Sequence, residues 1–424
     1  MAPISRVKGM PDLLPPQTAA WQRLLALHAT AAERYGYRLA EAPVLEHTDL
    51  FVRAVGAGTD IVDKEMFSFR HSHDEVTLRP EGTAGILRAV LAASLTQEQR
   101  PTRVHYAGPM FRAERPQANR FRQFHQVGVE AIGERSPHLD VEVIELAMDF
   151  VATLGIRDVS LQVNSLGDRD DRARYREALV GYYTPLEERL CEDCRRRLQV
   201  NPLRLLDCKT DAELAEAAPH LAASLSDASA EYFETVVDGL QAAGITAERN
   251  HRLVRGLDYY ADTAFEVWHG ALTGAQNALF GGGRYDGLAE ALGFKPAPGV
   301  GYAMGVERLL AVAEAEGSAP PVPAACDAVV LSLHPDQALA AAAAARPLRA
   351  AGLRVVVDSS ERKPGPRVAA AARLGAGVAV IIGPDEVAAG AATVRDMTTH
   401  EQAVHPLDQM VDRVLAALSQ ETPA

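Results

Sequence analysis

The apolar positions of the chain recur with a helical period in some segments and alternate in others. A helical period runs over residues 17–35 and again over 137–154, which predicts two amphipathic helices. Alternation over 67–70 and 75–80 predicts two strands of a hairpin, and a further helix begins near Glu81. This part of the chain is therefore expected to mix helices with strands that are joined by hairpins. A carboxylate at a helix start is electrostatically favoured, and this alone could explain a glutamate at position 81.

The segment 111–130 combines a polar, basic loop with an apolar strand that follows it. Its four arginines are Arg112, Arg115, Arg120 and Arg122. After the last of these, the pattern alternates toward Val127 and Val129, as in a half-buried strand. The segment therefore predicts a hairpin that presents cations to an anionic ligand. A solvated charged turn is the alternative, but it gives no purpose to Gln126 and Glu130 on an apolar strand.

Two further stretches on the N-terminal side of residue 315 carry a distinct pattern. Residues 168–245 are charged and helical, which predicts a helical insertion, and strands resume at 252–254 and 265–268. The stretch 37–44 reads as a short strand that Pro43 interrupts, so it is expected at a sheet edge or an interface. A dimerisation element and an ordinary surface hairpin both fit it.

The C-terminal quarter of the chain follows a proline-rich and alanine-rich stretch at 316–325, which is typical of a semi-rigid linker. Strands and helices then alternate, with strands expected at 328–333, 353–357 and 378–382 and helices at 336–351, 367–374 and 407–418. Such alternation predicts a small α/β domain with a largely parallel sheet. The most basic cluster of this part is formed by Arg362, Lys363 and Arg367.

Composition and charge limit the classes of function. The chain has 424 residues, 47% of them hydrophobic, and a net charge of −13, so two or three soluble domains are expected. An acidic protein has no overall basic field, and any nucleic-acid contact has to come from local patches. No apolar run is long enough to span a bilayer, the N-terminus lacks the apolar core of a secretory signal, and four cysteines argue against a disulfide framework. A cytoplasmic location without membrane attachment is expected.

Three of the four cysteines lie inside the expected insertion, at Cys191, Cys194 and Cys208. Three thiols with one close pair suggest a metal, but a structural zinc site needs four ligands. His220 could supply the fourth ligand if the fold brings it near. Buried or incidental thiols are the alternative, and no residue is assigned as a metal ligand on sequence grounds.

Three arginines from distant parts of the chain suggest phosphate chemistry. They are Arg112 in the basic hairpin, Arg255 after the strand at 252–254, and Arg308 at a glycine-rich helix start. When a carboxylate attacks the α-phosphorus of ATP, the transition state needs fixed cations on more than one side. The chain lacks the glycine-rich loop of P-loop enzymes, so that class is not expected.

Several strings of residues resemble motifs of a known family. Residues 111–115 resemble motif 2 of class II aminoacyl-tRNA synthetases, residues 301–309 resemble motif 3, and the helix and strand that end at Pro43 are similar to motif 1, the dimer-interface element. Within that class, three further strings resemble signatures of the histidyl-tRNA synthetases: 77–83, 253–260 and 280–287. The strings follow one another in order, and the resemblance runs from residue 6 to the C-terminal domain, so it covers essentially the whole chain.

The resemblance implies a fold and a division into domains. The expected fold is an α+β catalytic domain built on an antiparallel sheet of the class II synthetase type with a helical insertion, plus a C-terminal α/β anticodon-binding domain with a mainly parallel sheet. The catalytic domain would span 1–315, with its insertion at about 168–245. The linker would span 316–325 and the anticodon-binding domain 326–424.

The resemblance also implies an activity, that of a histidine–tRNA ligase. Such an enzyme activates L-histidine with ATP to histidyl-adenylate and pyrophosphate, and then transfers histidine to the 3′ end of tRNA(His). ATP with Mg²⁺ would be a substrate, no prosthetic group is expected, and the protein would act as a homodimer. The alternative is the non-catalytic, histidine-binding regulatory subunit of ATP phosphoribosyltransferase, which resembles these enzymes.

The family's roles in ATP binding can be placed on matching residues. Arg112 would hold the α-phosphate and the histidine carboxylate region, Arg255 would face the α-phosphate from the other side, and Arg308 would bind the γ-phosphate. These three arginines are the expected catalytic residues. Glu114 would receive the adenine amino group, and the ring of Phe124 would stack on the adenine.

The roles in binding histidine and tRNA are placed in the same way. The residues expected around histidine are Thr77, Arg79, Glu81, Arg112, Gln126, Glu130, Arg255, Tyr259, Tyr260 and Tyr285. An imidazole has two distinct nitrogens, so a selective pocket needs a carboxylate and a hydroxyl at opposed positions, and Glu130 and Tyr260 are of these types. Arg115 and Gln117 would face the acceptor end of the tRNA.

Overall fold

The structure is a computed structural model, and it divides into two compact units, residues 1–321 and 322–424, each of which is described by itself. The division falls within the stretch expected to be a linker. The residues that the structure describes are 3–56, 59, 61–115, 120–206, 208, 210–254, 259–272, 278–321, 323–360 and 362–419.

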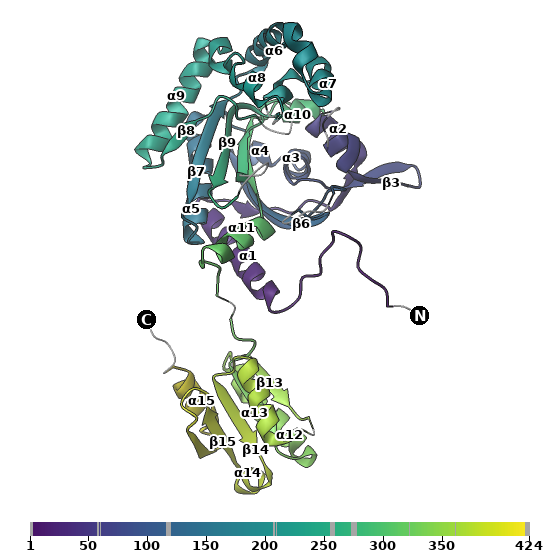
Figure 1. Ribbon diagram of the computed structural model, residues 1–424. Coiled ribbons are helices and arrows are strands. Elements are labelled where there is room, and N and C mark those ends of the chain that lie inside the picture. Colours follow the sequence, from purple (N-terminus) through teal and green to yellow (C-terminus); the bar gives the residue numbers. More distant parts are fainter. Residues whose placement is uncertain are drawn as a thin grey trace. The chain divides into compact units, whose positions relative to one another are not determined.

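An eight-stranded sheet forms the centre of the larger unit (Figure 1). Its strands, in spatial order, are β1 (Arg38–Leu39), β5 (Thr102–Phe111), β6 (Gln123–Ile132), β11 (Gly299–Gly305), β10 (Ala278–Arg284), β9 (Ala261–His269), β7 (Val159–Ser165) and β8 (Ala247–Arg249). The pairs between β5 and β7 along this order are all antiparallel, and only the edge strands β1 and β8 pair in parallel. The antiparallel sheet expected for this unit is confirmed.

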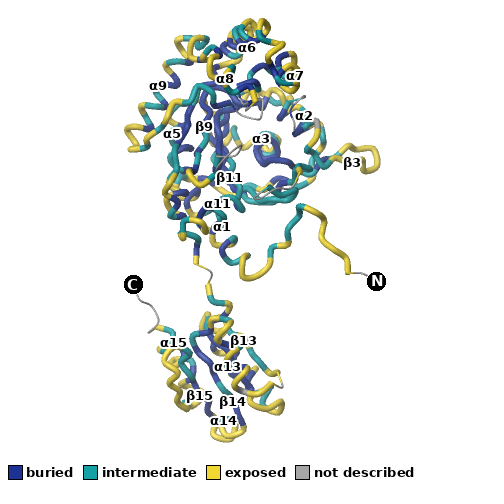
Figure 2. The backbone as a smooth tube through the Cα atoms, in the orientation of Figure 1, coloured by how far each residue is buried: buried dark blue, intermediate teal, exposed yellow. Residues whose placement is uncertain are grey.

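Helices cover both faces of the sheet and create two apolar cores. One core includes apolar residues of α1 (Gln17–Arg34), α5 (Pro137–Thr153), α9 (Asp227–Ala242) and α11 (Val306–Ala315). The other contains α3 (Thr83–Ala92), which is buried along most of its length (Figure 2). A small sheet of β2 (Leu45–His47), β4 (Asp74–Leu78) and β3 (Phe67–His71) adjoins it, together with α2 (Thr48–Val55), η1 (Ile61–Glu65), α4 (Leu95–Glu98) and α10 (Leu288–Ala291).

The insertion is helical, as its charged pattern predicted. Before α9 it consists of α6 (Arg169–Tyr183), η2 (Thr184–Arg189), α7 (Glu192–Val200), η3 (Pro202–Leu205), α8 (Ala212–Glu216) and η4 (Leu221–Ser224). A capping box fixes the start of α6, because the Asp168 carboxylate accepts the backbone N–H of Asp171 while the Asp171 carboxylate accepts that of Asp168.

Two local predictions in the larger unit were wrong. Residues 252–254 are not a strand: the Leu253 N–H bonds the Asn250 carbonyl in a turn, and the Asn164 side chain holds the Leu253 carbonyl. The strand lies just before them, as β8. The stretch 37–44 is also not one strand, because β1 ends at Leu39 and β2 begins only after Pro43.

The smaller unit carries a mixed sheet rather than the mainly parallel one expected. Its strand order is β13 (Val355–Asp358), β12 (Ala328–Ser332), β14 (Val378–Ile382), β15 (Ala391–Asp396) and β16 (Gln402–Pro406). β12 pairs in parallel with β13 and β14, whereas β14, β15 and β16 pair antiparallel. Its helices are η6 (Pro335–Gln337), α12 (Ala338–Ala350), α13 (Pro364–Arg373), α14 (Pro384–Ala389) and α15 (Met410–Ser419).

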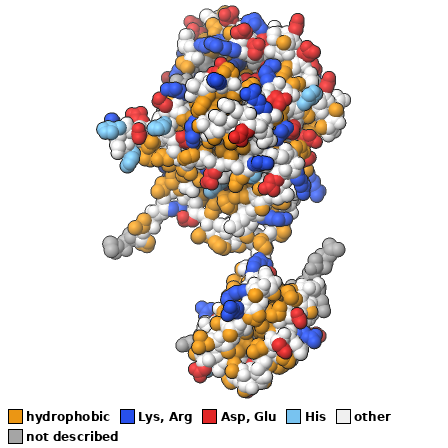
Figure 3. All heavy atoms as spheres, turned by 180° about the vertical axis from the view of Figure 1, so that it is seen from behind, with side chains coloured by type: hydrophobic (Ala, Val, Ile, Leu, Met, Phe, Trp, Pro, Cys, Tyr) orange, Lys and Arg blue, Asp and Glu red, His pale blue; other side chains and the backbone are white. Residues whose placement is uncertain are grey.

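The charged side chains of the two units differ in their exposure. Figure 3 shows basic and acidic side chains interspersed on the visible face of the larger unit. In the smaller unit, Arg367 does not join an exposed basic cluster: it is buried, and its guanidinium donates to the carbonyls of Ser332 and Asp358. Within the described residues, no helix is both long and apolar enough to cross a membrane.

Candidate functional site

A buried carboxylate, Glu130 on β6, forms the bottom of the candidate site. It is 0% exposed, and the Tyr285 hydroxyl donates to its Oε2 at 2.5 Å. The other oxygen, Oε1, has no hydrogen-bond partner among the described residues. Gly301 of β11 lies opposite Glu130 in the sheet register, and a Cβ at that position would collide with the carboxylate. The glycine therefore lets the carboxylate lie against the neighbouring strand.

The environment of Glu130 favours its protonated form. Burial raises the pKa of this carboxyl group to about 8, and the hydroxyl groups of Tyr285, Thr83 and Tyr106 oppose the shift. Of these three, only Tyr285 meets hydrogen-bond geometry with the carboxylate. A partner that donates to Oε1 would stabilise the ionised form. In the ionised form, Oε1 would be a buried acceptor without a partner, which costs about 1–3 kcal/mol, so the ionised carboxylate is a candidate for contact with a ligand N–H.

A second unpaired acceptor lies on the same strand. Gln126 and Glu130 are four residues apart on β6, so both side chains point to the same face of the sheet. Within the described part of the chain, Gln126 Oε1 is buried and also lacks a hydrogen-bond partner. The two orphan oxygens mark this face of β6 as a place where a ligand with several N–H groups would be held.

Aromatic rings gather beside Glu130. Tyr259, Tyr260 and Tyr285 are buried, with ring centroids 4.6 Å apart for the first pair and 6.0 Å apart for Tyr259 and Tyr285. Sequence reasoning missed Tyr106 of β5, which lies opposite Gly128 of β6 and fills the space that a side chain there would need. The only signal in the sequence was a tyrosine at an inward position of a strand.

Three residues expected near histidine have polar atoms that are engaged within the protein. The Glu81 carboxylate accepts the N–H groups of Thr83 and Ala84 at the start of α3, at 2.7 and 2.9 Å, and burial raises its pKa. Arg79 donates to the carbonyls of Pro109 and Ala42.

Thr77 shares hydroxyl hydrogen bonds with Thr48 and Ser68, at 2.8 and 2.7 Å. It is fully buried in the small sheet. The structure thus brings Thr77, Arg79 and Glu81 together as a braced segment that runs from β4 to the N-terminus of α3.

A second cluster lies at the loop end of the β5–β6 hairpin, where β5 connects to β6. The Arg112 Nε donates to the Pro80 carbonyl at 3.0 Å, and its guanidinium lies 5.4 Å from the centre of the Phe124 ring. Glu114 forms an ion pair with Arg120, with Oε2 and Nε 2.6 Å apart. The expected adenine-binding residues, Glu114 and Phe124, are therefore brought together at one end of this hairpin.

Arg308 joins this cluster from the start of α11. Its Nη1 donates to the Ala278 carbonyl at 2.5 Å. Burial lowers the pKa of the Arg308 guanidinium, and the positive charges of Arg120 and Arg112 lower it further, with Glu114 opposing them. Like charges that lie this close favour an anionic ligand, so the three arginines form a candidate phosphate site, here called the arginine cluster.

A contact that sequence reasoning missed fixes the arginine cluster to β6, the strand that carries Gln126 and Glu130. Glu307 precedes Arg308 on α11, and its carboxylate accepts the backbone N–H of His125 at 3.0 and 3.1 Å and lies 2.8 Å from the His125 Nδ1. This pair fastens the first turn of α11 to β6. No spacing or composition signal links residues 182 positions apart.

Some expected site residues cannot be placed in this way. Arg255 and Gln117 lie outside the described residues, and Arg115 is exposed at the end of the described part of its loop. Arg284 of the glycine-rich string 280–287 is fully buried, with ion pairs to Asp140 and Asp286, so its role is to hold the fold.

Comparison with known families agrees with the two-part architecture. The family model described as histidyl-tRNA synthetase matches residues 9–167 and 186–309, and the model described as anticodon binding domain matches residues 327–417. The chain belongs to the histidyl-tRNA synthetase family. The family and the class II fold expected from the motifs are confirmed.

Individual relatives match over nearly the full length. The histidine–tRNA ligase of Moorella thermoacetica is 44% identical over 411 residues, which are 96% of this chain and 97% of that protein. The histidine–tRNA ligase of Bacillus subtilis is 43% identical over 95% of this chain and 96% of its own length. The crystal structure of apo histidyl-tRNA synthetase from S. aureus is similar with a TM-score of 0.82 and 33% identity, covering 97% of this chain and 99% of that one.

Proposed function

We propose that this protein is a histidine–tRNA ligase. It would activate L-histidine with ATP to histidyl-adenylate and pyrophosphate, and then transfer the histidyl group to the 3′ end of tRNA(His). The observation that carries the proposal is the buried Glu130 carboxylate with one unpaired oxygen, in a chain of the histidyl-tRNA synthetase family. An imidazole N–H is the partner that this oxygen needs.

Recognition of histidine would depend on both ends of the amino acid. Glu130 accepts one imidazole N–H, and Tyr260, with Tyr259 and Tyr285, encloses the ring. Gln126 and Glu81 take the α-ammonium group, while Thr77 and Arg79 hold the segment that presents Glu81. The unpaired Gln126 oxygen supports this assignment, because an ammonium group would supply the missing donor.

Activation would proceed by attack of the histidine carboxylate oxygen on the α-phosphorus of ATP, with pyrophosphate as the leaving group. Arg112 and Arg255 hold the α-phosphate from two sides, and Arg308 binds the γ-phosphate. ATP enters as its Mg²⁺ complex, in which phosphate oxygens are the natural ligands of the ion. The convergence of positive charge around Arg308 supports this arrangement.

The adenine ring would bind at the loop end of the β5–β6 hairpin, beside Phe124 and Glu114. Phe124 offers an aromatic face that already carries the Arg112 guanidinium, and Glu114 accepts the adenine amino group. Glu114 forms an ion pair with Arg120 in the free protein, so the adenine amino group would share this carboxylate with Arg120 or displace it.

In the second step, a hydroxyl of the 3′-terminal ribose attacks the carbonyl carbon of the adenylate and AMP leaves. Arg115 and Gln117 would face the acceptor end, and residues 327–417 would bind the anticodon region. An arginine suits the donor and acceptor pattern of a guanine edge.

The proposal includes a homodimer in the cytoplasm, where tRNA is charged. Apolar side chains are exposed within and just after the segment that resembles motif 1, with Leu39 69% and Leu45 42% exposed, and on β3 of the small sheet that contains Leu45, with Phe69 49% exposed. Burial of these side chains against a second copy would remove an apolar surface from water.

Histidine-dependent exchange between ATP and pyrophosphate tests the first step, and charging of tRNA(His) tests the second. Exchange that requires histidine is the expected result. A well-folded, dimeric preparation that binds histidine without exchange would refute the proposal and favour the regulatory-subunit alternative.

The role of Arg255 has a separate test. Arg255→Ala should abolish most adenylate formation while histidine still binds, because the substitution removes a cation from the α-phosphate. Arg252→Ala, three positions earlier, is the matched control and should keep both adenylate formation and histidine binding. Normal turnover in Arg255→Ala would contradict the assigned role.

A further inference from the structure

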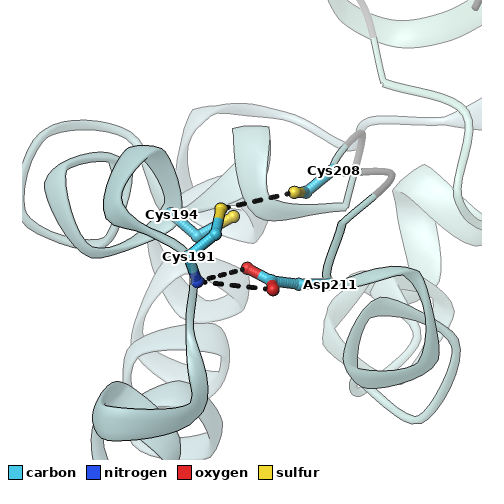
Figure 4. Close-up of side chains that lie close together, drawn as sticks. All are labelled: Cys191, Cys194, Cys208 and Asp211. Carbon is cyan, nitrogen blue, oxygen red and sulfur yellow. Dashed lines mark hydrogen bonds between the residues drawn. The ribbon is translucent and has the colours of Figure 1, made fainter.

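A cluster of three thiols and a carboxylate lies inside the helical insertion. Cys191, Cys194, Cys208 and Asp211 bring one ligand atom each to within 4.8 Å of one another (Figure 4). Cys191 and Cys194 lie at the N-terminus of α7, Cys208 follows η3, and Asp211 precedes α8. We call these four residues the Cys₃Asp cluster; it is remote in sequence from every residue assigned to catalysis.

The spacing of the cluster has the form of a structural metal site. Cys191 and Cys194 have two residues between them, and so do Cys208 and Asp211. Two such pairs, separated by the helix α7 and the turn η3, follow the Cys-x₂-Cys…Cys-x₂-Cys arrangement of zinc sites, with aspartate at the fourth position. The fold does not bring His220 to the thiols: its ring stacks on His251, at 3.7 Å between centroids, and Asp211 is the residue that joins them.

The distances fit a tetrahedral ion. The sulfur atoms of Cys191 and Cys208 are 3.8 Å apart. Two thiolates at about 2.3 Å from one tetrahedral Zn²⁺ are separated by about 3.8 Å, whereas a disulfide needs about 2.05 Å. Both carboxylate oxygens of Asp211 lie within 3.3 Å of the Cys191 backbone N–H, which orients the carboxylate and leaves lone pairs for an ion.

The surroundings also suit a closed site. Cys194 is fully buried, Cys208 and Asp211 are each 8% exposed, and Cys191 is partly exposed. Thiolates are soft ligands that select zinc over magnesium or calcium, and four protein ligands leave no open position for a substrate.

We propose that the Cys₃Asp cluster binds one Zn²⁺ as a structural site. The ion takes the place of the thiol protons, which leave to solvent, and it fastens the two ends of the segment from α7 to α8. Cys194 and Cys208 belong to the same apolar core as Tyr259, Tyr260 and Tyr285, so the ion would also support the wall of the pocket.

Metal analysis of the full-length protein, purified with its thiols reduced, tests the proposal directly. One zinc per chain is expected, and the chelator-treated protein should take up one Zn²⁺ again. Cys208→Ser should lower the affinity for Zn²⁺ at least 100-fold. Cys326→Ser is the matched control, because Cys326 is also buried but lies in the smaller unit, and it should keep the full zinc content. Asp211→Asn should bind zinc more weakly than the parent protein but more tightly than Cys208→Ser.

Cobalt distinguishes the outcomes if Cys208→Ser fails to fold. Co²⁺ added to the chelator-treated parent protein should give thiolate charge-transfer bands and the visible bands of a tetrahedral ion. Failure to bind either metal at micromolar concentration overturns the proposal. So does zinc binding that is equal in folded Cys208→Ser and Cys326→Ser, or a Cys191–Cys208 disulfide, seen as the loss of two hydrogens in the mass of protein purified without oxidant.

Discussion

At the scale of single residues, burial of Glu130 acts in opposite directions on stability and on ligand binding. The pKa of the carboxyl group is about 8 in the folded protein, against 4.5 for the free group, so the folded chain holds a proton that the unfolded chain releases. Between these values the stability contributed by Glu130 falls as pH rises. Binding of an imidazole N–H requires the ionised form, so the affinity for histidine should rise over the same interval.

Glu130→Gln should separate these two effects. The variant should lose the part of the pH dependence of stability that comes from this group, so that its melting temperature relative to the parent rises from pH 5 to pH 8. Its KM for histidine should increase about 100-fold, because a charge-assisted hydrogen bond worth about 3 kcal/mol is lost. Thermal unfolding and ATP–pyrophosphate exchange measure the two quantities. Glu134→Gln, at an exposed carboxylate nearby, should change neither; an unchanged KM in Glu130→Gln would remove Glu130 from the pocket.

The sequence made the residue types of the site predictable but not their partners. Glu130 could be singled out because a carboxylate on an apolar strand lacks a structural purpose, and family motifs supplied Tyr285. Their hydrogen bond joins residues 155 positions apart and depends on the register of three strands, β6, β11 and β10. Tyr106 was missed for the same reason, since alternation shows that it points inward but not that it faces Gly128.

At the scale of elements, the contact between β6 and α11 sets the position of the arginine cluster. Glu307 holds both the backbone and the ring of His125, so Arg308 is presented from a fixed first turn. The His125 ring also packs edge-on against Trp21 of α1, with 5.1 Å between centroids. Three elements therefore fix the cation that would bind the γ-phosphate.

Glu307→Ala should weaken the binding of ATP more than the binding of histidine. Loss of the contact loosens the first turn of α11 by an amount worth about 1.4 kcal/mol, which is a tenfold rise in the KM for ATP. The KM for histidine should stay within about twofold, since Glu130 and Gln126 keep their strand. Steady-state exchange with each substrate varied in turn measures the split. Glu314→Ala, an exposed glutamate on the same helix, is the control, and an equal rise in both KM values would count against this reading.

A second element-scale prediction concerns α5 and β10. Asp140 of α5 and Arg284 of β10 form an ion pair in which both side chains are 0% exposed, and Tyr232 and Thr263 also donate to Asp140. Asp140→Ala leaves a buried arginine without this partner and should destabilise the larger unit by about 3–5 kcal/mol.

Urea unfolding of the variant measures this loss. Asp149→Ala, on the exposed side of the same helix, should cost under about 1 kcal/mol. Equal losses in the two variants would mean that the buried pair contributes no more than a surface one.

Elements with strong periodicity were predictable, and those that tertiary contacts define were not. The helix over 17–35 and the 111–130 hairpin follow directly from their patterns. The β15–β16 hairpin was missed because β16 is mostly exposed and has little apolar alternation, so pairing with β15 rather than burial makes it a strand. That hairpin converts the expected parallel sheet into a mixed one.

At the scale of the whole molecule, the two compact units allow the two steps of the proposed reaction to be separated. All the described residues of both clusters lie within residues 1–321, and the match to the anticodon binding domain lies within 322–424. The shorter chain 1–321 should therefore keep histidine-dependent exchange within about threefold of the full chain.

The same truncation should lower kcat/KM for tRNA(His) about 100-fold or more, because it removes the contacts of the second unit with tRNA. A 100-fold loss corresponds to about 3 kcal/mol of binding free energy. Circular dichroism and size-exclusion chromatography establish that the fragment is folded. Undiminished charging by a folded fragment would show that the second unit contributes no binding energy.

Under the proposed function, the arginine cluster would hold the pyrophosphate product as well as ATP. Arg112, Arg120 and Arg308 lie near one another in the free protein, and their mutual repulsion helps to lower the pKa of Arg308. A bound polyphosphate cancels that repulsion, so every turnover has to restore it when the product leaves. Removal of pyrophosphate from solution would then favour forward flux, and small polyanions would compete with ATP for the same site.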